Sequence, residues 1–300
     1  GWYHELIIVP DPANNNLYYL FSIGGIGTNV NKGLFYSVID MTLDGGNGAV
    51  TIKNFQLENF NMVDCLTAVK HGNGRDWWLI FRKSDVLTFG GNNDWYSYLI
   101  SPDGITNFNQ QSIGSLNRTN GGQIDFSVTG NKLAFTCLTG VLEVFDFDRC
   151  TGLLSNPVTI EQDPFAPPYN INISVDFSHD ATRLNSSSIT DPSYLLQYNL
   201  LDTPNITLSK DTIWQISRVP HSLGKIRLMD DNKIYVSCAN NNGININYPY
   251  PDSIRNFINE NLSVINSPDS LGALCDFQPF SFYLGGKRTY YGLPNNTDYD

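Results

Sequence analysis

The stretch Gly122–Gly152, GQIDFSVTGNKLAFTCLTGVLEVFDFDRCTG, decides the fold. It holds three runs of β-branched and aromatic residues, Ile124–Val128, Lys132–Cys137 and Val141–Phe147, and Gly, Asn, Thr and Asp fill the gaps between them. Runs of this composition between such turns are typical of antiparallel strands. The third run is apolar on both faces, which is typical of a strand covered on both sides. The stretch therefore predicts three consecutive β-strands.

A variant of this unit recurs along the chain. In each copy a turn is followed by a large apolar residue that opens a strand, and these anchor residues lie 50 to 60 positions apart. The anchors are Leu17, Trp77, Leu133, Leu184 and Ile234. A short apolar run precedes each anchor, at Ile8-Val9, Ala68-Val69, Phe126, Phe177 and Leu228. A third run follows at 34–41, 95–100, 141–147, 194–200 and 244–248, and a fourth, outer run at 50–55, 157–160 and 212–216.

Four strands in a repeat of this length are typical of the blades of a β-propeller. A single blade is too small to be stable alone, and packing blades face to face buries both of its faces. Five units run from Leu6 to about Ile265, and a sixth, incomplete unit begins at Leu274. We therefore expect an all-β fold, a β-propeller of four-stranded blades, with six or seven blades when closed.

No linker or change of composition divides residues 1–300, so we expect a single β-propeller domain that lacks N-terminal blade sequence. The missing strands would come from residues 2–6 or from sequence upstream of Gly1. The only candidate for a helix is a short one at Asp252–Asn261.

Composition limits the partners. The net charge is −11, and the 18 Lys and Arg residues form no run, which disfavours binding to nucleic acid and to an anionic membrane surface. No apolar run reaches the length of a membrane span, and no signal peptide is visible in a sequence that starts at Gly. The sequence has the character of a mature or excised piece.

Two resemblances follow from the motifs. The turns in FSVTGNKLAF at 126–135 and FSHDATRL at 177–184 resemble the WD40-like repeats of bacterial propellers, in which the turn commonly reads S-P-D-G. A closer likeness covers nearly the whole chain, through IIVPDPANNNLYYLF, GLFYSVIDMTLDGGNGAVTIKN, LTAVKHGNGRDWWLI, YLISPDGI, LEVFDFDRCTG, YLLQYNL and YGLPN, in that order. This order is similar to the propeller-like N-terminal region of large secreted surface proteins of Bacteroidota.

Proteins of that family often carry a type IX secretion sorting domain or a gliding-associated domain at the C-terminus. The resemblance implies an extracellular or cell-surface location and further propeller sequence before the IVPDP segment. The family's ending usually reads GLPNF, whereas Asn296 follows GLPN here, and no sorting domain is present. The family brings no catalytic residues to carry over.

Cysteines and histidines give no metal or redox motif. The five cysteines form no C-x-x-C pair; Cys137 and Cys238 are expected to be small buried hydrophobes, and a disulfide is open to Cys65, Cys150 and Cys275. The histidines, His4, His71, His179 and His221, lack metal-binding spacing, and His71 and His179 are expected in blade turns. We predict no catalytic, cofactor-binding or metal residues and no cofactor.

One set of carboxylates has two interpretations. Asp125, Asp176 and Asp276 each precede a Phe at the head of a run assigned to an inner strand, where they could form an acidic ring that holds Ca²⁺ or another cation. The alternative, which we favour, is that each carboxylate caps a turn or bonds a neighbouring blade. Arg227 near the equivalent place in the fifth unit also weakens the ring.

The remaining candidates are aromatic residues, a loop and modification motifs. Six aromatic residues adjoin loops and could stack on sugars or anchor a protein, or else pack at blade edges: Trp95, Tyr96, Tyr248, Tyr250, Tyr290 and Tyr291. The loop Asp44–Gly48 is expected to be a turn. N-x-S/T triplets begin at Asn117, Asn172, Asn185, Asn205, Asn261 and Asn295, and Asp211, Asp252 and Asp269 each open a triplet similar to the O-glycosylation pattern of exported Bacteroidota proteins.

These observations lead to a hypothesis of function. We expect a non-enzymatic interaction or adhesion module of a secreted cell-surface protein, with a protein or glycan partner and without nucleic acid or membrane insertion. One alternative is a glycan-binding or glycan-cleaving propeller. Another is a structural subunit of an extracellular assembly.

Overall fold

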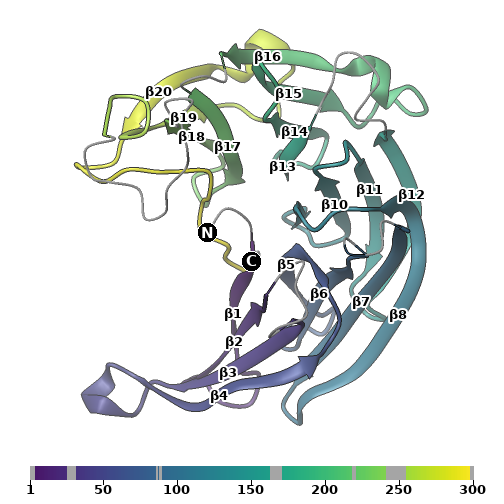
Figure 1. Ribbon diagram of the computed structural model, residues 1–300, viewed down its shortest axis with the longest axis vertical. Coiled ribbons are helices and arrows are strands. Elements are labelled where there is room, and N and C mark those ends of the chain that lie inside the picture. Colours follow the sequence, from purple (N-terminus) through teal and green to yellow (C-terminus); the bar gives the residue numbers. More distant parts are fainter. Residues whose placement is uncertain are drawn as a thin grey trace. The chain divides into compact units, whose positions relative to one another are not determined.

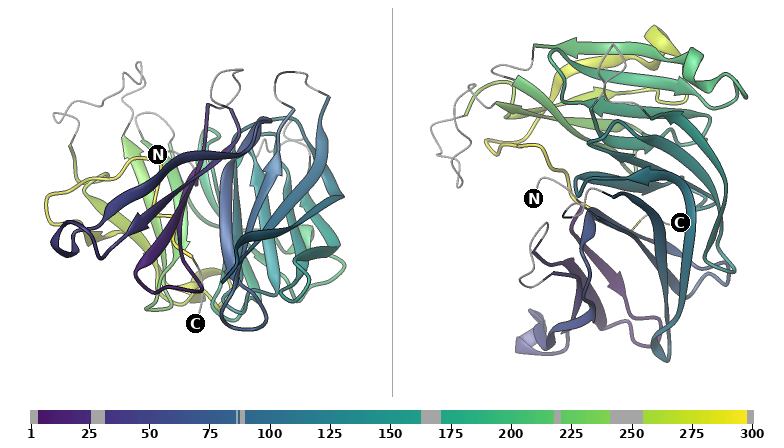
Figure 2. Two further views of the ribbon diagram at one scale, coloured as in Figure 1. Left: turned by 90° about the horizontal axis from the view of Figure 1, so that it is seen from below. Right: turned by 45° about the vertical axis from the view of Figure 1, so that its right-hand side comes forward.

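The computed structural model describes residues 4–25, 32–85, 87, 90–162, 171–217, 221–240 and 255–297. Its strands form five four-stranded antiparallel sheets, and in each sheet the strands lie side by side in chain order (Figures 1 and 2). No helix among these residues is long and apolar enough to cross a membrane.

The bounds of the strands follow the repeat. Sheet 1 holds β1 Leu6–Pro10, β2 Leu17–Ile23, β3 Leu34–Asp40 and β4 Ala49–Glu58. Sheet 2 holds β5 Met62–Lys70, β6 Trp77–Lys83, β7 Asn92–Ser101 and β8 Gly104–Asn117. Sheet 3 holds β9 Gly122–Phe126, β10 Lys132–Cys137, β11 Leu142–Asp148 and β12 Leu153–Glu161. Sheet 4 holds β13 Asn172–Phe177, β14 Arg183–Ser188, β15 Ser193–Asn199 and β16 Asp211–Ile216. Sheet 5 holds β17 His221–Leu228, β18 Ile234–Asn240, β19 Asn261–Ile265 and β20 Phe277–Tyr283.

The repeat predicted from the sequence is confirmed for five units. Each of the five anchor residues lies in the first two positions of the second strand of its sheet. In the deciding stretch, β10 has the predicted bounds, whereas β9 ends two residues early, because Gly130 N–H donates to Ser127 O at 2.7 Å and closes the turn.

Three predictions near the C-terminus differ from the structure. Phe277 does not begin a sixth unit; it opens β20, the fourth strand of sheet 5. The third run predicted at 244–248 lies outside the described residues, and the third strand of this sheet is β19, so the assignment slipped by one strand. The described part of the predicted helix, 255–260, is a turn, in which Asn256 Oδ1 accepts the N–H groups of Ile258 and Asn259.

The chain divides into two compact units. The N-terminal unit comprises His4–Phe135, Glu143–Thr159 and residues from Pro294 on, and it contains sheets 1 and 2 and most of sheet 3. The C-terminal unit comprises Thr136–Leu142 and Ile160–Leu293 and contains sheets 4 and 5. The prediction of a single domain stays a prediction.

Each unit has a core between consecutive sheets. In the N-terminal unit, Ile7, Val9 and Phe21 of sheet 1 pack on Leu66 and Leu79 of sheet 2. In the C-terminal unit, Leu195 of sheet 4 packs against a cluster from sheet 5 that consists of Leu223, Ile226, Ile234, Val236 and Ile265. Burying side chains of this kind contributes about 1.5–3 kcal/mol each. Sheet-on-sheet packing is therefore the main source of stability within each unit.

Candidate functional site

Sheets 1 and 2 can be compared residue by residue, because their first hairpins have matching register. The pair nearest the turn is Pro10 with Tyr18 in sheet 1 and Lys70 with Trp77 in sheet 2. Equivalent backbone hydrogen bonds close the two turns: Asp11 N–H donates to Leu17 O at 3.0 Å, and His71 N–H donates to Asp76 O at 2.8 Å. Residues at the same distance from these turns are therefore equivalent.

The side of sheet 2 that packs on sheet 1 is named the covered face. Its side chains are Leu66, Ala68, Trp77, Leu79, Tyr96, Ile100 and Ile105. The equivalent side chains of sheet 1, which we name the open face, are Leu6, Ile8, Tyr18, Leu20, Phe35, Ile39 and Val50. These residues alternate with Ile7, Val9 and Phe21 of the core, so they point to the other side of sheet 1.

The two equivalent faces differ in exposure. Leu66, Ala68, Leu79 and Ile100 are fully buried. On the open face, Leu6 is 47%, Ile8 is 45% and Val50 is 53% exposed, and the other four side chains are half-buried. An apolar patch of this kind on one side of a sheet is typical of a surface that another element covers.

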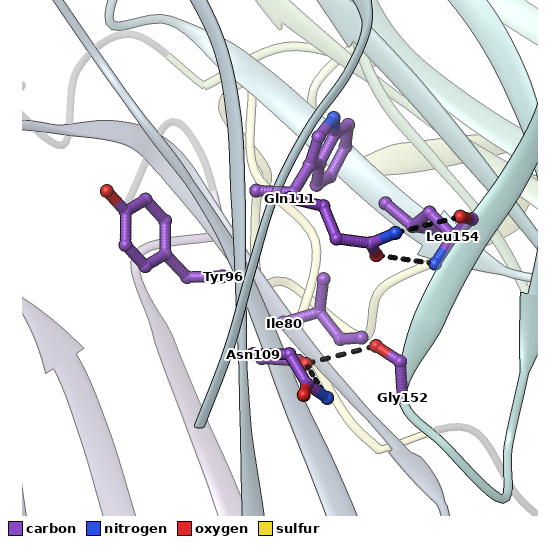
Figure 3. Close-up of a pocket in the computed structure, with 8 residues that line it drawn as sticks. Ile80, Tyr96, Asn109, Gln111, Gly152 and Leu154 are labelled. Carbon is purple, nitrogen blue, oxygen red and sulfur yellow. Dashed lines mark hydrogen bonds between the residues drawn. The ribbon is translucent and has the colours of Figure 1, made fainter. Parts of the chain in front are cut away.

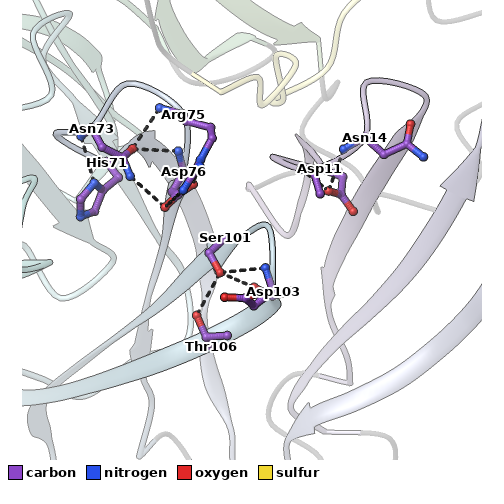
Figure 4. Close-up of polar contacts among 11 residues, drawn as sticks. Asp11, Asn14, His71, Asn73, Arg75, Asp76, Ser101, Asp103 and Thr106 are labelled. Atoms are coloured by element: carbon purple, nitrogen blue, oxygen red, sulfur yellow. Dashed lines mark hydrogen bonds and ion pairs between the residues drawn. The ribbon is translucent and has the colours of Figure 1, made fainter.

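Loops of the N-terminal unit form a second candidate surface, in which polar side chains are fixed by local hydrogen bonds (Figure 4). In the β5–β6 turn, Asn73 Oδ1 accepts the N–H groups of Arg75 and Asp76, each at 3.0 Å. Arg75 Nε donates to Asp76 Oδ1 at 2.7 Å, and its side chain is 59% exposed. The hydrogen bond from Arg75, with that from Asn73, holds the pKa of Asp76 below its usual value in spite of burial. The turn thus presents an oriented guanidinium to solvent.

Neighbouring turns are held in the same way. In the β1–β2 loop, Asp11 Oδ1 accepts the N–H groups of Ala13 and Asn14 at 2.7 and 3.2 Å. In the β7–β8 turn, Ser101 Oγ accepts the N–H of Asp103 at 3.2 Å (Figure 4). Side chains that are fixed in this way lose little conformational freedom when a partner binds.

A narrow crevice lies between sheets 2 and 3, and its polar groups bond the two sheets to each other and leave no room for a ligand (Figure 3). Gln111 Nε2 donates to Leu154 O at 3.1 Å, Leu154 N–H donates to Gln111 Oε1 at 2.7 Å, and Ser97 Oγ donates to Gly152 O at 3.0 Å. The volume open to the centre of a water molecule is about 10 Å³, which is room for about one water. The polar groups therefore hold sheets 2 and 3 together.

Two of the three carboxylates considered for a cation ring, Asp125 and Asp176, are buried and hydrogen-bonded. Asp125 is fully buried and accepts hydrogen bonds from Gln123 Nε2 at 3.1 Å and Phe126 N–H at 3.0 Å. Asp176 is 3% exposed and accepts from Phe177 N–H at 2.7 Å and from Leu228 N–H of sheet 5. Both bonding patterns fit the favoured interpretation, a role in the repeat.

The prediction that Asp276 lies at the head of an inner strand is wrong. It ends the 3₁₀ turn η3 Gly272–Cys275, is exposed and precedes the outer strand β20, so it does not lie on an inner strand. Arg227 lies on β17, the first strand of sheet 5, and is buried. Among the described residues, no group of three His, Cys, Asp or Glu side chains could hold a metal ion.

The aromatic candidates are mostly buried. Trp95, Tyr96 and Tyr291 are 2%, 7% and 8% exposed, so the expectation of exposed rings is wrong for these three. Trp95 packs edge-on against Phe135 and Phe145 of sheet 3, which is the blade-edge packing that was the alternative. Tyr290 is half-buried, and Tyr248 and Tyr250 lie outside the described residues.

Cys150 and His71 are neighbours on the surface of the N-terminal unit but do not form a reactive pair. None of the five cysteines takes part in a disulfide, and Cys137 and Cys238 are buried, as expected. Cys150 is exposed, and His71 lies beside it in the predicted turn. However, His71 Nδ1 accepts the N–H of Asn73 at 3.0 Å, so Nε2 carries the proton and faces Cys150 O at 3.1 Å. This histidine is therefore not arranged to deprotonate the thiol.

The other motifs are placed as follows. Asp44–Gly46 forms a 3₁₀ turn, as expected for a turn. Among the N-x-S/T triplets, Asn205 is exposed, whereas Asn117, Asn172, Asn185 and Asn261 are buried, and Asn295 is half-buried. Of the acidic triplets, Thr212 after Asp211 is exposed and Ser270 after Asp269 is half-buried, and the triplet at Asp252 lies outside the described residues.

Comparisons with known proteins give distant likenesses. No protein-family model and no curated protein sequence matches the chain. The chain is similar to the solved structure of a luciferin-regenerating enzyme, at 11% identity and a TM-score of 0.48, over 82% of this chain and 73% of that chain. It is similar to the β-propeller domain of Cps50 (Swd1) from Myceliophteria thermophila, at 10% identity and a TM-score of 0.44, over 76% and 65% of the two chains.

A chain of a nidogen/laminin complex is similar at 11% identity and a TM-score of 0.47, over 95% of this chain and 82% of that chain. Likenesses at these identities and TM-scores give no basis for transferring an activity.

Proposed function

We propose that residues 1–300 supply five blades of a β-propeller that has six or seven blades when closed, and that this propeller is a non-enzymatic interaction or adhesion module of a secreted cell-surface protein. The observation that carries the architectural part of the proposal is the open face of sheet 1. It has apolar side chains where sheet 2 has its covered face, and Leu6 and Ile39 match Leu66 and Ile100 in residue type.

The order in which the sheets pack along the chain indicates which element would cover the open face. The covered face of sheet 2 is covered by sheet 1, which precedes it in the chain, and only residues 59–61 connect the two sheets. By the same rule, a four-stranded unit that precedes β1 would cover the open face of sheet 1. We propose that such a unit belongs to the closed propeller.

The interaction role rests on the loops of the N-terminal unit. Loops that a rigid scaffold positions are where binding residues concentrate. The β5–β6 turn holds Arg75 against Asp76 and exposes its remaining N–H groups, which suits a carboxylate or another planar acceptor on a partner. The resemblance to secreted Bacteroidota surface proteins and the acidic composition support an extracellular location.

The architectural part of the proposal is tested by hydroxyl-radical footprinting. Residues 1–300 and the full-length natural polypeptide are labelled side by side, and modification is read at Leu6, Ile8 and Tyr18. We expect these side chains to be modified several-fold less in the full-length protein, with Leu66 and Leu79 protected in both samples. Equal labelling of the open face in both samples would refute the covering unit.

The functional part is tested by binding. The labelled protein is applied to the outer surface of its source cells, to a protein array and to a glycan array. Arg75→Ala should weaken binding by about tenfold, the effect of losing one interface hydrogen bond to a charged group. Lys53→Ala, which removes another exposed cation of the same unit, should not.

Other results would select an alternative. Turnover of a glycan would favour a glycan-cleaving propeller, and binding to glycans alone would favour a glycan-binding one. Concentration-dependent self-association in sedimentation velocity, without a cell-surface partner, would favour a structural subunit.

A further inference from the structure

Four aromatic rings form a connected row along two outer strands of the C-terminal unit. Ring centroids lie 5.3 Å apart for Trp214 and Phe277, 5.5 Å for Trp214 and Phe280, and 5.8 Å for Phe257 and Phe280. Trp214 lies on β16, Phe277 and Phe280 lie on β20, and Phe257 comes from the turn before β19 (Figure 1). Phe257 is 65% exposed, and the other three are half-buried. We name these four residues the aromatic row.

The backbone of Phe280 has an unfavourable conformation. Its φ is +52°, in the left-handed region that a bulky side chain seldom adopts. It lies in a bulge of β20, where the register shifts opposite Leu262–Val264 and Phe280 N–H donates to Ser263 Oγ at 3.0 Å. The bulge turns Phe280 toward Trp214, so the row depends on it.

Sheet 1 shows how the same bulge is made without strain. In β4, Asn54 has φ +52°, and its N–H donates to Ser37 Oγ at 3.0 Å. Asn tolerates this conformation because its side chain can bond locally. A serine-held bulge on an outer strand therefore accepts Asn, yet sheet 5 has Phe at this place. Strain that the backbone does not need is an indication of a functional role for the side chain.

The setting of the row limits its ligand. Pro279 and the bulge interrupt the hydrogen-bonding edge of β20, so a partner cannot extend the sheet there and has to contact side chains. Neither DTIWQI of β16 nor FQPFSFY of β20 contains Lys or Arg, which disfavours an anionic ligand. Trp214 and Phe277 pack by one side against the core of sheets 4 and 5, so the row offers a ligand only the exposed parts of its rings.

We propose that the aromatic row binds a neutral polysaccharide chain. Sugar rings would lie against the exposed ring faces through their C–H groups. This site goes beyond the proposed function, since it involves neither the open face of sheet 1 nor the Arg75 turn.

The most informative variant follows from the bulge in sheet 1, where Asn54 has the conformation of Phe280. Phe280→Asn places the residue of the sheet 1 bulge into the sheet 5 bulge, keeps the backbone N–H bond to Ser263, and removes one ring. Wild type and variant are tested by affinity electrophoresis and calorimetry against neutral glucans, mannans, xylans and galactans. We expect the variant to keep or exceed the wild-type melting temperature and to lose about tenfold or more in affinity, the usual effect of removing an aromatic anchor.

Two further variants keep the test independent of folding. Phe257→Ala removes the most exposed ring of the row from a turn and should weaken binding similarly. Phe55→Ala removes an exposed Phe, 55% exposed on β4, that lies outside the row, and it should bind as wild type does. The proposal is overturned if wild type binds none of these polysaccharides, if Phe280→Asn binds unchanged, or if the row binds proline-rich peptides instead.

Discussion

Leu6 and Leu66 occupy the same place in two equivalent hairpins, yet Leu6 is 47% exposed and Leu66 is fully buried. The difference does not arise from the residues, because Ile39 and Ile100 show the same contrast at the next strand pair. It arises from the neighbouring sheet, because sheet 1 packs on this face of sheet 2. A hydrophobic pattern in a repeat thus specifies an interface, and a neighbouring unit determines whether that interface is filled.

The two sheets also differ in a side-chain link that accompanies the covered face. Tyr98 OH of sheet 2 donates to Glu58 Oε1 of sheet 1 at 2.5 Å. Burial and this hydrogen bond raise the pKa of Tyr98, which keeps the phenol protonated as a donor. The equivalent residue of sheet 1 is Ser37, whose hydroxyl binds Asn54 in its own sheet. The open face therefore lacks the tyrosine that joins neighbouring sheets.

The largest difference between the faces is expected from removing the matched leucines. Leu66→Ala should lower the free energy of unfolding by about 2–5 kcal/mol, because it leaves a cavity in a filled core. Leu6→Ala should cost less than about 1 kcal/mol, because that side chain is half in water already. Urea unfolding of both variants measures the contrast. Equal costs would show that the open face is covered within this chain.

Removing the tyrosine link should have a smaller effect. Tyr98→Phe removes the partner of a carboxylate and should cost about 1.5–3 kcal/mol in unfolding free energy. Tyr18→Phe, on the open face, serves as the control and should stay within about 0.5 kcal/mol of wild type. If Tyr98→Phe is as stable as wild type, the hydrogen bond to Glu58 does not hold the two sheets together.

A residue from the C-terminal end tests the equivalence of the two hairpins directly. Asn295 Nδ2 donates to Leu6 O at 3.1 Å and to Leu66 O at 2.9 Å, which are the same carbonyl of β1 and of β5. Asn295→Ala should cost about 1–2 kcal/mol in unfolding free energy because it loses both bonds, and Asn295→Asp more, because a negative carboxylate oxygen would face both carbonyl oxygens. Thr297→Ala is the control, and hydrogen exchange at β1 and β5 should increase only in the Asn295 variants.

The repeat could be predicted because short, local sequence features mark each unit. Turns rich in Gly and Asn, followed by a large apolar residue such as Trp77 or Ile234, identify the second strand of every sheet. The fifth unit was harder, since β19 follows a long insertion and the outer strand β20 contains Pro279 and three Phe residues. The sequence pattern gives the order of the apolar runs, but it does not show which runs become strands and which belong to a loop.

The candidate site was less predictable, because exposure depends on neighbouring sheets. Trp95 adjoins a loop in the sequence, but sheet 3 covers it. Leu6 and Leu66 have the same local pattern and opposite exposure. The aromatic row joins Trp214 to Phe257 and Phe280, far apart in sequence, and it depends on a bulge that no local motif signals.

The smallest effect is expected from pH, at the turns that precede β2 and β6. The hydrogen bond from Arg75 lowers the pKa of Asp76 in the folded state, whereas Asp11 at the β1–β2 loop accepts from the main-chain N–H groups of Ala13 and Asn14 and from the Tyr19 hydroxyl, and has no arginine partner. A lowered folded-state pKa stabilises the fold above the unfolded pKa of about 3.9, and this contribution is lost as the pH falls through the folded pKa. Asp76→Asn should therefore reduce the loss of stability between pH 6 and pH 3 by about 1 kcal/mol or less.

Asp11→Asn is the comparison for this effect. It removes a carboxylate from the equivalent loop without removing an arginine partner, so it should change the acid sensitivity less than Asp76→Asn does. Urea titrations at both pH values measure the two differences. If Asp11→Asn has the larger effect, the arginine bond does not distinguish the two turns, and their hydrogen-bonded loops act on stability in the same way.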